Sequence, residues 1–429
     1  MKVLIVGGGG REHALAWKLC RDDPSIELIA APGNPGIGSR GRCVPIGADK
    51  LKDLVNLADG EQIDLTVVGP ESPLEAGIVN LFQTHGLPVF GPTREAARIE
   101  TSKRFAKELM VRSGIPTARA SHHSEAKEAK AALADFASPV VIKASGLAGG
   151  KGVIVAQSTA EAERAIDAML SDRVFGAAGR EILIEEFIEG EELSLLAITD
   201  GQQALPLLAA QDHKRLLEGD FGPNTGGMGA YSPTSIATPE LISRAMTEII
   251  RPALSAMRQS GSPFKGLLYA GLMITDEGPK VVEFNCRFGD PETQTIMPLM
   301  DSPLLELLAR VARGDSLSRA GYPAWKPLCA VTTVVAAAGY PDKVRTGDVI
   351  HLPPPEEGVE VFHAGTARHP LTNELLTAGG RVLSVTAVAS TLIEAAELSR
   401  SHAEQVSFSG KQLRRDIGWR ELMRGARVT

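Results

Sequence analysis

The sequence has few cysteines and no long apolar run. Its four cysteines lie at positions 20, 43, 286 and 329, and none belongs to a C-x-x-C pair. This usage argues against a structural zinc site and is typical of a reducing compartment. No apolar stretch is as long as a membrane-spanning helix requires, which is about 18 residues. The opening MKVLIVGGGG has too short an apolar run for a secretory signal. We therefore expect a cytoplasmic protein with no membrane partner.

The sequence also has fewer basic residues than acidic ones. The chain has 45 Lys and Arg residues against 52 Asp and Glu residues, so its formal net charge is −7. A broad basic surface is excluded, and no nucleic-acid partner is expected. An anionic ligand must then be held by local lysines, arginines and backbone amides. The 429 residues are enough for about three domains.

The most informative stretch is present at 138–155, SPVVIKASGLAGGKGVIV. It predicts a strand, a glycine-rich loop and a second strand. Lys143 ends the first strand, and a lysine is costly to bury unless an anion meets it. The glycines let backbone N–H groups approach such an anion. The stretch therefore predicts a lid over nucleotide phosphates, although a flexible surface hairpin with a solvated lysine also fits. It is not a Walker loop, because Gly152 follows Lys151.

The first 92 residues alternate short apolar runs with helical stretches. Strands are expected at 3–6, 28–31, 65–68 and 89–90, and this βαβ series predicts a parallel sheet. Ligands of such sheets bind beyond the carboxyl ends of the strands. Those ends carry Gly7 to Arg11, Gly33-Asn34 and Glu71. The first loop lacks the G-x-G-x-x-G spacing of dinucleotide sites. We interpret it as a loop for phosphate or another small anion with Arg11, or as a plain tight turn.

The remainder reads as helices and hairpins. Helices are expected after Ser102 and after Ser158, where Glu161 would complete a capping box. Hairpins are expected around Asp200-Gly201 and 276–279. The polar, glycine-rich segment 211–234 is too long for a plain connector and predicts a functional loop. From about residue 323, strands and a helix that starts with a capping box of Thr391 and Glu394 predict a small α+β domain.

A metal site is predicted in the run VVEFNC. Strand side chains alternate between faces, so Glu283 and Asn285 share one face while Val282, Phe284 and Cys286 form the core face. Hard oxygen ligands of this kind suit Mg²⁺, which also binds substrate phosphates. Two solvated polar residues on an edge strand would give the same pattern. Arg287, which follows, suits bidentate binding of a carboxylate or phosphate.

Two further motifs carry polar groups. The run 184–194, IEEFIEGEELS, can offer main-chain groups to an adenine edge, with Glu192 accepting ribose hydroxyls. An acidic hairpin exposed to water is the other interpretation. In the run 212–215, DHKR, Asp212 beside Lys214 could orient an amine and an anion together. No Ser/His/Asp or Cys/His arrangement stands out, so no nucleophilic catalysis by the protein is expected.

Several separated motifs together resemble the glycinamide ribonucleotide synthetases (phosphoribosylamine–glycine ligases), a family of the ATP-grasp superfamily. The resemblance spans essentially the whole chain, and its most specific motifs are GPNTGGMGAYSP and EFNCRFGDPETQ. The others are GGGGREHALAW, APGNPG, VVGPE, FGPT, SK-x-F, VIKASGLAGGKGV, EEFIEGEELS, QDHKR, GLLYAGLMI, FHAGT and DIGWREL.

The resemblance implies a multidomain α/β and α+β fold. Its parts would be an N-terminal parallel-sheet domain (1–101), an ATP-grasp domain (102–322) with a mobile lid (about 120–190), and a small C-terminal α+β domain (323–429). It implies that ATP, glycine and 5-phosphoribosylamine give glycinamide ribonucleotide, ADP and phosphate through glycyl phosphate, in purine biosynthesis. The cofactor would be Mg²⁺ or Mn²⁺, and the protein a monomer or weak homodimer.

The resemblance also implies roles for individual residues. The expected ATP-binding residues are Lys103, Lys143, Gly146, Gly149, Gly150, Lys151, Gly152, Glu185, Glu186, Ile188 and Glu192. The expected metal ligands are Glu283 and Asn285. The expected catalytic residues are Arg287, Asp212 and Lys214. The expected residues for glycine, its acyl phosphate or phosphoribosylamine are Gly10, Arg11, Asn34, Glu71, Asp290, Pro291, Glu292 and Thr293.

The chain departs from the family pattern in the lid and near the metal site. Ser145 stands where many members carry Asp, and Gly149 where they carry Ala, which predicts a looser, less acidic lid. The strand 267–275 contains no acid, so Glu283 is the only clear acidic metal ligand. Three other functions fit parts of the sequence: a carboxylase acting on bicarbonate, a nicotinamide-dependent oxidoreductase, and a non-catalytic nucleotide sensor.

Overall fold

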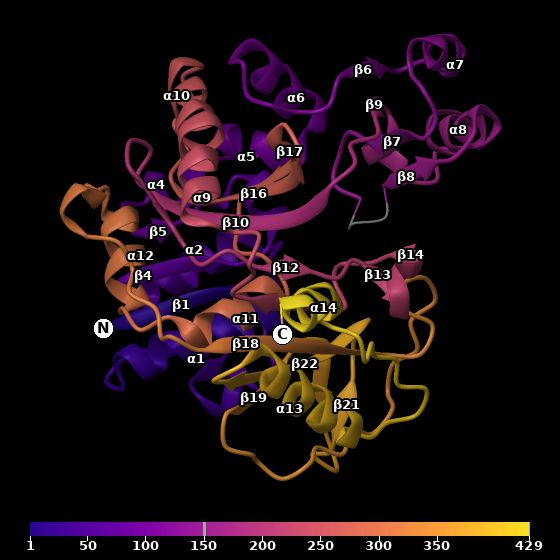
Figure 1. Cartoon of the computed structure of the whole chain (residues 1–429). Coiled ribbons are helices and arrows are strands. Elements are labelled where there is room, and N and C mark those ends of the chain that lie inside the picture. Colours follow the sequence, from indigo (N-terminus) through magenta and orange to yellow (C-terminus); the bar gives the residue numbers. More distant parts are fainter. Residues whose placement is uncertain (149–151, 429) are drawn as a thin grey trace.

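The N-terminal region forms the predicted parallel sheet. The computed structural model describes residues 1–148 and 152–428 (Figure 1). The five strands have the order β3-β2-β1-β4-β5, and every neighbouring pair is parallel. The strands are β1 (Lys2–Gly7), β2 (Glu27–Pro32), β3 (Arg42–Cys43), β4 (Leu65–Val68) and β5 (Val89–Phe90). The helices between them are α1 (Gly10–Asp22), α2 (Leu51–Gly60), α3 (Glu71–Ala76) and α4 (Ile78–Thr84).

The central region contains two four-stranded sheets. The first, β6-β9-β7-β8, is antiparallel and forms an outlying lobe with α7 and α8 (Figure 1). The second, β11-β10-β16-β17, is also antiparallel. The lobe consists of β6 (Ala120–His123), α7 (Ala126–Ala132), β7 (Val140–Ala144), β8 (Val153–Ala156), α8 (Thr159–Ile166) and β9 (Ile182–Glu186). The second sheet consists of β10 (Glu191–Thr199), β11 (Ala204–Pro206), β16 (Gly266–Thr275) and β17 (Gly278–Asn285).

Helices of the central region share one apolar core with the second sheet and the N-terminal sheet. Ile99, Leu109, Leu254, Leu272 and Phe284 are buried together in it. This shared core fixes the N-terminal sheet against the sheet that carries Glu283. The helices are α5 (Arg94–Thr101), α6 (Lys103–Arg112), α9 (Pro239–Ala245) and α10 (Arg251–Gln259), and α11 (Glu292–Ile296) and α12 (Leu304–Arg313) follow β17.

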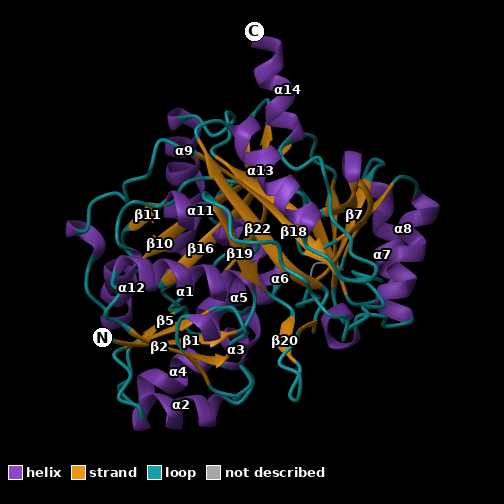
Figure 2. Ribbon diagram, turned by 90° about the horizontal axis from the view of Figure 1, so that it is seen from below, coloured by secondary structure: helices purple, strands orange, loops and turns teal. Residues whose placement is uncertain are grey.

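The C-terminal sheet takes two of its five strands from the central region. Its order is β12-β15-β18-β22-β19, and α13 packs on β18 and β22 (Figure 2). Its elements are β12 (Gln211–Asp212), β15 (Gly229–Ser232), β18 (Cys329–Ala336), β19 (Val359–His363), β22 (Arg381–Ala389) and α13 (Leu392–Gln405). Two ribbons, β13 (Arg215–Leu217) with β14 (Phe221–Asn224) and β20 (Thr366–Arg368) with β21 (Leu375–Thr377), and α14 (Trp419–Val428) complete the chain.

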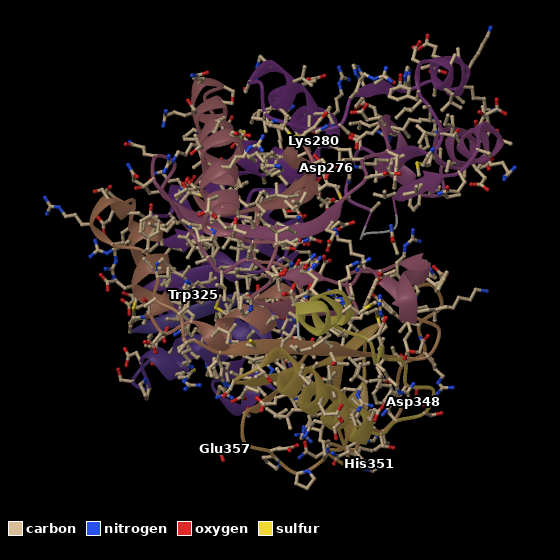
Figure 3. The ribbon with its side chains drawn as sticks, viewed as in Figure 1. Asp276, Lys280, Trp325, Asp348, His351 and Glu357 are labelled. Carbon is tan, nitrogen blue, oxygen red and sulfur yellow. The ribbon has the colours of Figure 1, made fainter. Side chains whose placement is uncertain are left out.

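The side-chain view shows the β16–β17 hairpin in the upper half of the molecule and the C-terminal part in the lower half (Figure 3). Asp276 and Lys280 mark the outer end of the β16–β17 hairpin, whereas Asp348 and His351 lie on the C-terminal part (Figure 3). The predicted multidomain α/β and α+β architecture is confirmed. No helix in the described ranges is long and apolar enough to cross a membrane.

Three local predictions were wrong. The segment 211–234 is not one long loop but contains four short strands, β12 to β15. Val282 does not lie on the core face, because a bulge in β17 places Gly271 opposite Glu283 and Leu272 opposite Val281. Val281 is therefore fully buried instead. The Ser158 hydroxyl caps α8 as predicted, but the Glu161 carboxylate accepts from the N–H of Gln157 rather than that of Ser158.

Candidate active site

Two adjoining cavities lie where the three regions meet. The hinge cavity, of about 460 Å³, is lined by residues 185–192, the β7–β8 hairpin and the 211–215 segment. The junction cavity, of about 330 Å³, is lined by residues of all three regions. Lys143, Glu185, Glu192, Asp212 and Lys214 line both. The predicted lid hairpin, the metal strand and the 212–214 segment are thus brought together.

A buried lysine cluster surrounds one carboxylate at the base of the β7–β8 hairpin. The Nζ of Lys143 lies 2.7 Å from one Glu185 oxygen, and the Nζ of Lys107 lies 3.0 Å from the other. Burial alone would raise the pKa of Glu185, but Lys143 and Lys107 together hold it below its ordinary value. Lys143 also donates to the carbonyl of Val282 at 3.1 Å, which ties the hairpin to β17.

Lys103 adds a third, half-buried cation beside this cluster. Its Nζ lies 3.5 Å from the carbonyl oxygen of Gly146, at the entrance to the glycine-rich loop. Burial lowers the pKa of Lys103, and the nearby charge of Lys143 lowers it further, although Glu283 opposes this shift. Two neighbouring cations, one buried and one half-buried, are an arrangement that phosphate oxygens would stabilise.

The lining of the hinge cavity combines apolar side chains with polar and charged ones. Val141, Val153, Val155 and Met273 line it, together with the main chain at 186–190. The Glu186 side chain accepts the N–H of Arg119 at 2.8 Å, so it points away along the strand. Such a cavity fits a planar base, with main-chain groups available to its edge. In the same lining, the Glu192 carboxylate lies 2.5 Å from the Nζ of Lys214.

Glu283 and Asn285 lie side by side on β17 and both line the junction cavity. Burial would raise the pKa of Glu283, but Lys214, Lys103 and Lys143 outweigh it, so the carboxylate is held ionised. No group of three or more His, Cys, Asp or Glu residues in the described ranges forms a metal cage. A carboxylate and an amide oxygen fit Mg²⁺, which would take its remaining ligands from substrate phosphates and water.

The charges lining the junction cavity almost cancel. Eight carboxylates face seven basic groups, so the lining has almost no net charge. A highly charged anion such as a nucleoside triphosphate would therefore need an accompanying cation. The acids are Glu71, Glu100, Glu185, Glu192, Asp212, Glu283, Asp290 and Glu292, and the bases are Arg11, Lys103, Lys107, Lys143, Lys214, Arg287 and Arg381.

Arg11 and Arg287 share the carboxylate of Glu71. The Arg287 Nε lies 3.1 Å from it and the Arg11 Nη2 lies 3.4 Å from it. Burial would raise the pKa of Glu71, but the two guanidinium groups lower it to about 2. Arg287 also pairs with Glu100 at 3.2 Å, and Arg11 pairs with Glu12 at 2.8 Å. A substrate carboxylate or phosphate would therefore have to share these donors with Glu71.

Asp212 and Glu292 form an acidic corner beside Tyr269. Glu292 is only 2% exposed and accepts from the Tyr269 hydroxyl at 2.6 Å and from the Ser194 hydroxyl at 3.0 Å. Burial raises the pKa of Asp212 to about 8; Lys214 opposes this shift, and Glu292 and Glu192 add to it. A carboxyl group that holds its proton near neutral pH is suited to receive an amine or to exchange a proton with one.

Five predicted site residues do not line either cavity, and three others lie outside the described ranges. The Asn34 amide donates to the carbonyls of Gly8 at 2.9 Å and His363 at 2.8 Å, so it shapes the first loop instead. The Thr293 hydroxyl donates to the carbonyl of Gly289 at 2.6 Å. The remaining three are Gly10, Gly146 and Pro291. Gly149, Gly150 and Lys151 belong to the segment that the structure does not describe.

Sequence reasoning missed several residues that line the junction cavity. Tyr269 lies within the recognised motif GLLYAGLMI, so its polar hydroxyl in an apolar strand was an available signal. Lys107 lies one helical turn after Lys103 on α6, which was a second signal. Glu100 and Arg381 gave none, because only the tertiary fold brings them to the cavity.

Comparisons with known proteins cover almost the whole chain. Three family models match: the N domain of phosphoribosylglycinamide synthetase over residues 1–100, its ATP-grasp (A) domain over 101–293, and its C domain over 330–420. A phosphoribosylamine–glycine ligase of Xylella fastidiosa is 48% identical over 428 residues, which cover 99% of each chain. One of Escherichia coli is 47% identical over 430 residues, again covering 99% of each.

Solved structures agree with the sequence comparisons. The crystal structure of phosphoribosylamine–glycine ligase from Thermotoga maritima superposes with a TM-score of 0.84 at 36% identity, covering 97% of this chain and 100% of that one. A biotin carboxylase from Campylobacter jejuni superposes with a TM-score of 0.73 over 96% of this chain and 92% of its own, but at 16% identity. The second likeness shows a shared fold alone.

Proposed function

The chain belongs to the phosphoribosylglycinamide synthetase family, and from this we infer that the paired cavities are the active site of an ATP-dependent ligase. The enzyme joins glycine to 5-phosphoribosylamine and gives glycinamide ribonucleotide, ADP and phosphate, a step of purine biosynthesis. The observation that carries this function is the full-length match together with one cavity that collects Lys143, Glu185, Glu283 and Asn285.

Two chemical steps account for the products. The glycine carboxylate attacks the γ-phosphoryl group of ATP, forming glycyl phosphate and releasing ADP. The amine of phosphoribosylamine then attacks the glycyl carbonyl, forming the amide and releasing phosphate. Phosphoryl transfer depends mostly on positioning and charge neutralisation, which agrees with a site rich in lysines and without a protein nucleophile.

The roles of individual residues are part of the proposal. Lys143 and Lys103 neutralise the phosphate oxygens, and Gly152, just before β8, lines the same cavity. The main chain at 186–188 receives the adenine edge, and Glu192 the ribose. Arg287 orients the glycine carboxylate and its acyl phosphate beside the turn that contains Asp290, while Arg11 lies where the second substrate would enter.

The acidic corner suits the amine chemistry. Glu292 can hold the glycine ammonium group, and Asp212, whose pKa lies near neutrality, can in its ionised form accept the proton that the attacking amine loses. Lys214, which lies beside both Glu192 and Asp212, keeps these carboxylates in place. Glu283 and Asn285 would hold a divalent cation, which when bound neutralises charge on the phosphates. Mg²⁺ is the proposed cation, and Mn²⁺ would fit the same oxygen ligands.

The proposed partners are small molecules. A monomer or weak homodimer in the cytoplasm is proposed, with no nucleic-acid or membrane partner; the net charge of −7 agrees with this. These features affect neither the residues of the site nor its test.

The decisive experiment measures ADP release by the purified protein with Mg-ATP and phosphoribosylamine made in situ, with and without glycine. Glycine-dependent release, with an equal amount of ribonucleotide product, is expected. Release that depends on bicarbonate and ignores glycine would assign the ATP-grasp fold to a different acid substrate. Nucleotide binding without any ADP release would instead favour a nucleotide sensor.

A further inference from the structure

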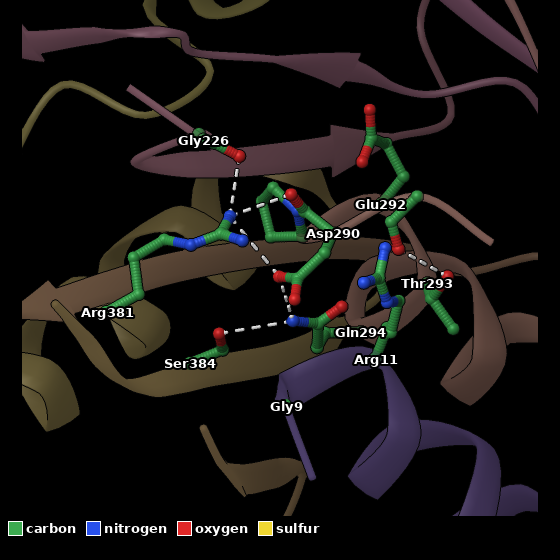
Figure 4. A network of polar contacts seen from close by, with 12 residues as sticks. Gly9, Arg11, Gly226, Asp290, Glu292, Thr293, Gln294, Arg381 and Ser384 are labelled. Atoms are coloured by element: carbon green, nitrogen blue, oxygen red, sulfur yellow. Dashed lines mark hydrogen bonds and ion pairs between the residues drawn. The ribbon is translucent and has the colours of Figure 1, made fainter. Parts of the chain in front are cut away.

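Both main-chain polar groups of Gly226 are held by side chains of the C-terminal region. Its N–H donates to the hydroxyl of Tyr340 at 3.0 Å, and its carbonyl accepts from Nη1 of Arg381 at 2.5 Å (Figure 4). A Cβ at position 226 would meet the Arg381 guanidinium carbon at 3.1 Å, so the backbone lies directly against the guanidinium group. Gly226 lines the junction cavity within the GPNTGGMG segment.

The same nitrogen of Arg381 also holds the Asp290 turn. It donates to the main-chain carbonyl of Asp290 at 2.7 Å and lies 3.3 Å from the Asp290 carboxylate. Burial would raise the pKa of Asp290, but Arg381 and Arg11 outweigh it and keep the carboxylate ionised. One donor of the C-terminal region therefore joins two segments that line the junction cavity (Figure 4).

The Gly226 segment in turn fixes Lys214. The N–H and the hydroxyl of Thr225 both donate to the Lys214 carbonyl, at 2.7 and 2.8 Å. The Thr225 hydroxyl also accepts the N–H of Gly227 at 3.0 Å. A displacement of Gly226 would thus be transmitted directly to Lys214, whose Nζ pairs with Glu192 at 2.5 Å.

We propose that Arg381 and Tyr340 are positioning residues of the ligation reaction, through which the C-terminal region sets Lys214 and Asp290 in place. This inference rests on the proposed function of the cavity. All three Arg381 contacts come from a single nitrogen, so the role needs one cationic donor at one point. The positioning role does not need the bidentate hydrogen bonding with which arginine binds a substrate carboxylate or phosphate.

The single-nitrogen contact makes a sharp prediction for two substitutions. Arg381→Met lowers kcat by about 100-fold, because a small misplacement of reacting groups has an effect of this size. Arg381→Lys restores kcat to within about 5-fold of the wild type, since one ammonium group can replace one nitrogen. The KM for ATP changes less than kcat in both variants, because Arg381 does not line the hinge cavity that would receive the adenine. Arg368→Met, an exposed arginine of the same region, is the matched control.

Tyr340→Phe provides an independent test that leaves the core packing intact. We expect a fall in kcat of about 10-fold, as for the loss of one hydrogen bond. The fall in the double variant with Arg381→Met is smaller than the product of the two single falls, because both side chains hold the same glycine. Tyr322→Phe is its control, since Tyr322 is 72% exposed.

Amide exchange of the peptide 221–232 reports the position of this segment without any turnover. Exchange is faster in Arg381→Met and Tyr340→Phe than in the wild type, and it returns to the wild-type rate in Arg381→Lys.

Unchanged exchange and unchanged kcat in Arg381→Met would overturn the proposal. The proposal would also be overturned if Arg381→Lys were as inactive as Arg381→Met and both variants had a selectively raised KM for phosphoribosylamine. That result would mean that Arg381 binds this substrate directly. If the wild type showed no glycine-dependent ADP release, the proposed function would be rejected instead. The amide exchange rates would then still decide whether Arg381 and Tyr340 position the 221–232 segment.

Discussion

The ammonium group of Lys143 lies 2.7 Å from the carboxylate of Glu185, and the two side chains are 6% and 5% exposed. The pair joins β7 to β9 at the point where the glycine-rich hairpin begins. The Glu185 carboxylate thus fixes the position of Lys143, and the same residue lines the hinge cavity, where its motif predicted a residue for adenine.

Replacing Glu185 with Gln should weaken both stability and catalysis. A buried lysine would lose its counter-charge, so the free energy of unfolding should fall by about 3 kcal/mol. Turnover should fall by about 100-fold because Lys143 is no longer held at the phosphates. Urea unfolding and ADP release measure the two effects. Glu181→Gln, at an exposed ion pair with Arg104, is the control. Wild-type turnover in Glu185→Gln would show that Lys143 needs no such partner.

Glu283→Gln should lower turnover by at least about 100-fold, because the bound cation neutralises charge that develops in the transition state. The measurement is ADP release at saturating Mg-ATP. Glu277→Gln is the matched control, since this residue lies in the turn before the same strand and is 79% exposed in its ion pair with Lys280. Near-normal activity of Glu283→Gln would remove Glu283 from the metal site.

Arg11→Ala should raise the KM for phosphoribosylamine more than the KM for ATP. Arg11 lies at the start of α1 and shares Glu71 with Arg287, away from the hinge cavity. Initial-rate kinetics with each substrate varied in turn make the comparison, with Arg21→Ala on the exposed side of the same helix as control. An equal rise in both constants would argue against a role of Arg11 in binding the second substrate.

Acid should weaken the contact between the N-terminal and C-terminal regions. The Nδ1 of His13 accepts the N–H of His363 at 2.8 Å, which requires an unprotonated ring nitrogen. Burial lowers the pKa of His13 well below its ordinary value and lowers that of His363 to about 4. Because these values lie below that of the unfolded chain, near 6.5, the unfolded state binds more protons. Stability is therefore complete above about pH 6.5 and is lost as the pH falls toward 4.

The variant His13→Asn tests this dependence, since the asparagine oxygen can accept the same hydrogen bond without titrating. Between pH 6.5 and 5, the slope of unfolding free energy against pH should be shallower in the variant by up to about 1.4 kcal/mol per pH unit. Urea titrations at several pH values give the slopes. Identical slopes would mean that His13 does not titrate with unfolding.

Local patterns predicted most elements of the fold. The parallel strands before residue 92, the lid hairpin, the β16–β17 hairpin and the capping box of Thr391 and Glu394 are all observed. Each depends on apolar periodicity or on polar groups within four residues. The bulge at Val282 was not predictable, because it depends on how β17 pairs with β16 and not on its own sequence.

The site was predictable only where its residues lie in continuous motifs. Lys143, Glu283 and Asp212 were found because neighbouring residues marked a strand end or a shared strand face. Arg381 lies at the start of an ordinary strand, and its contacts with Gly226 and Asp290 span 155 and 91 residues of the chain. Such contacts depend on tertiary packing, which no short pattern encodes.

The pairing of β15 with β18 determines whether the C-terminal region of this enzyme can be removed or exchanged for that of a relative. A protein shortened before residue 323 would leave β15 as an open edge and remove Arg381 and Tyr340, so an independent catalytic fragment is not expected. Exchange of the last hundred or so residues between relatives would succeed only if the donor also matched the 211–232 segment. The C-terminal quarter therefore folds together with the catalytic core as one unit, even though it looks like a separate appendage along the sequence.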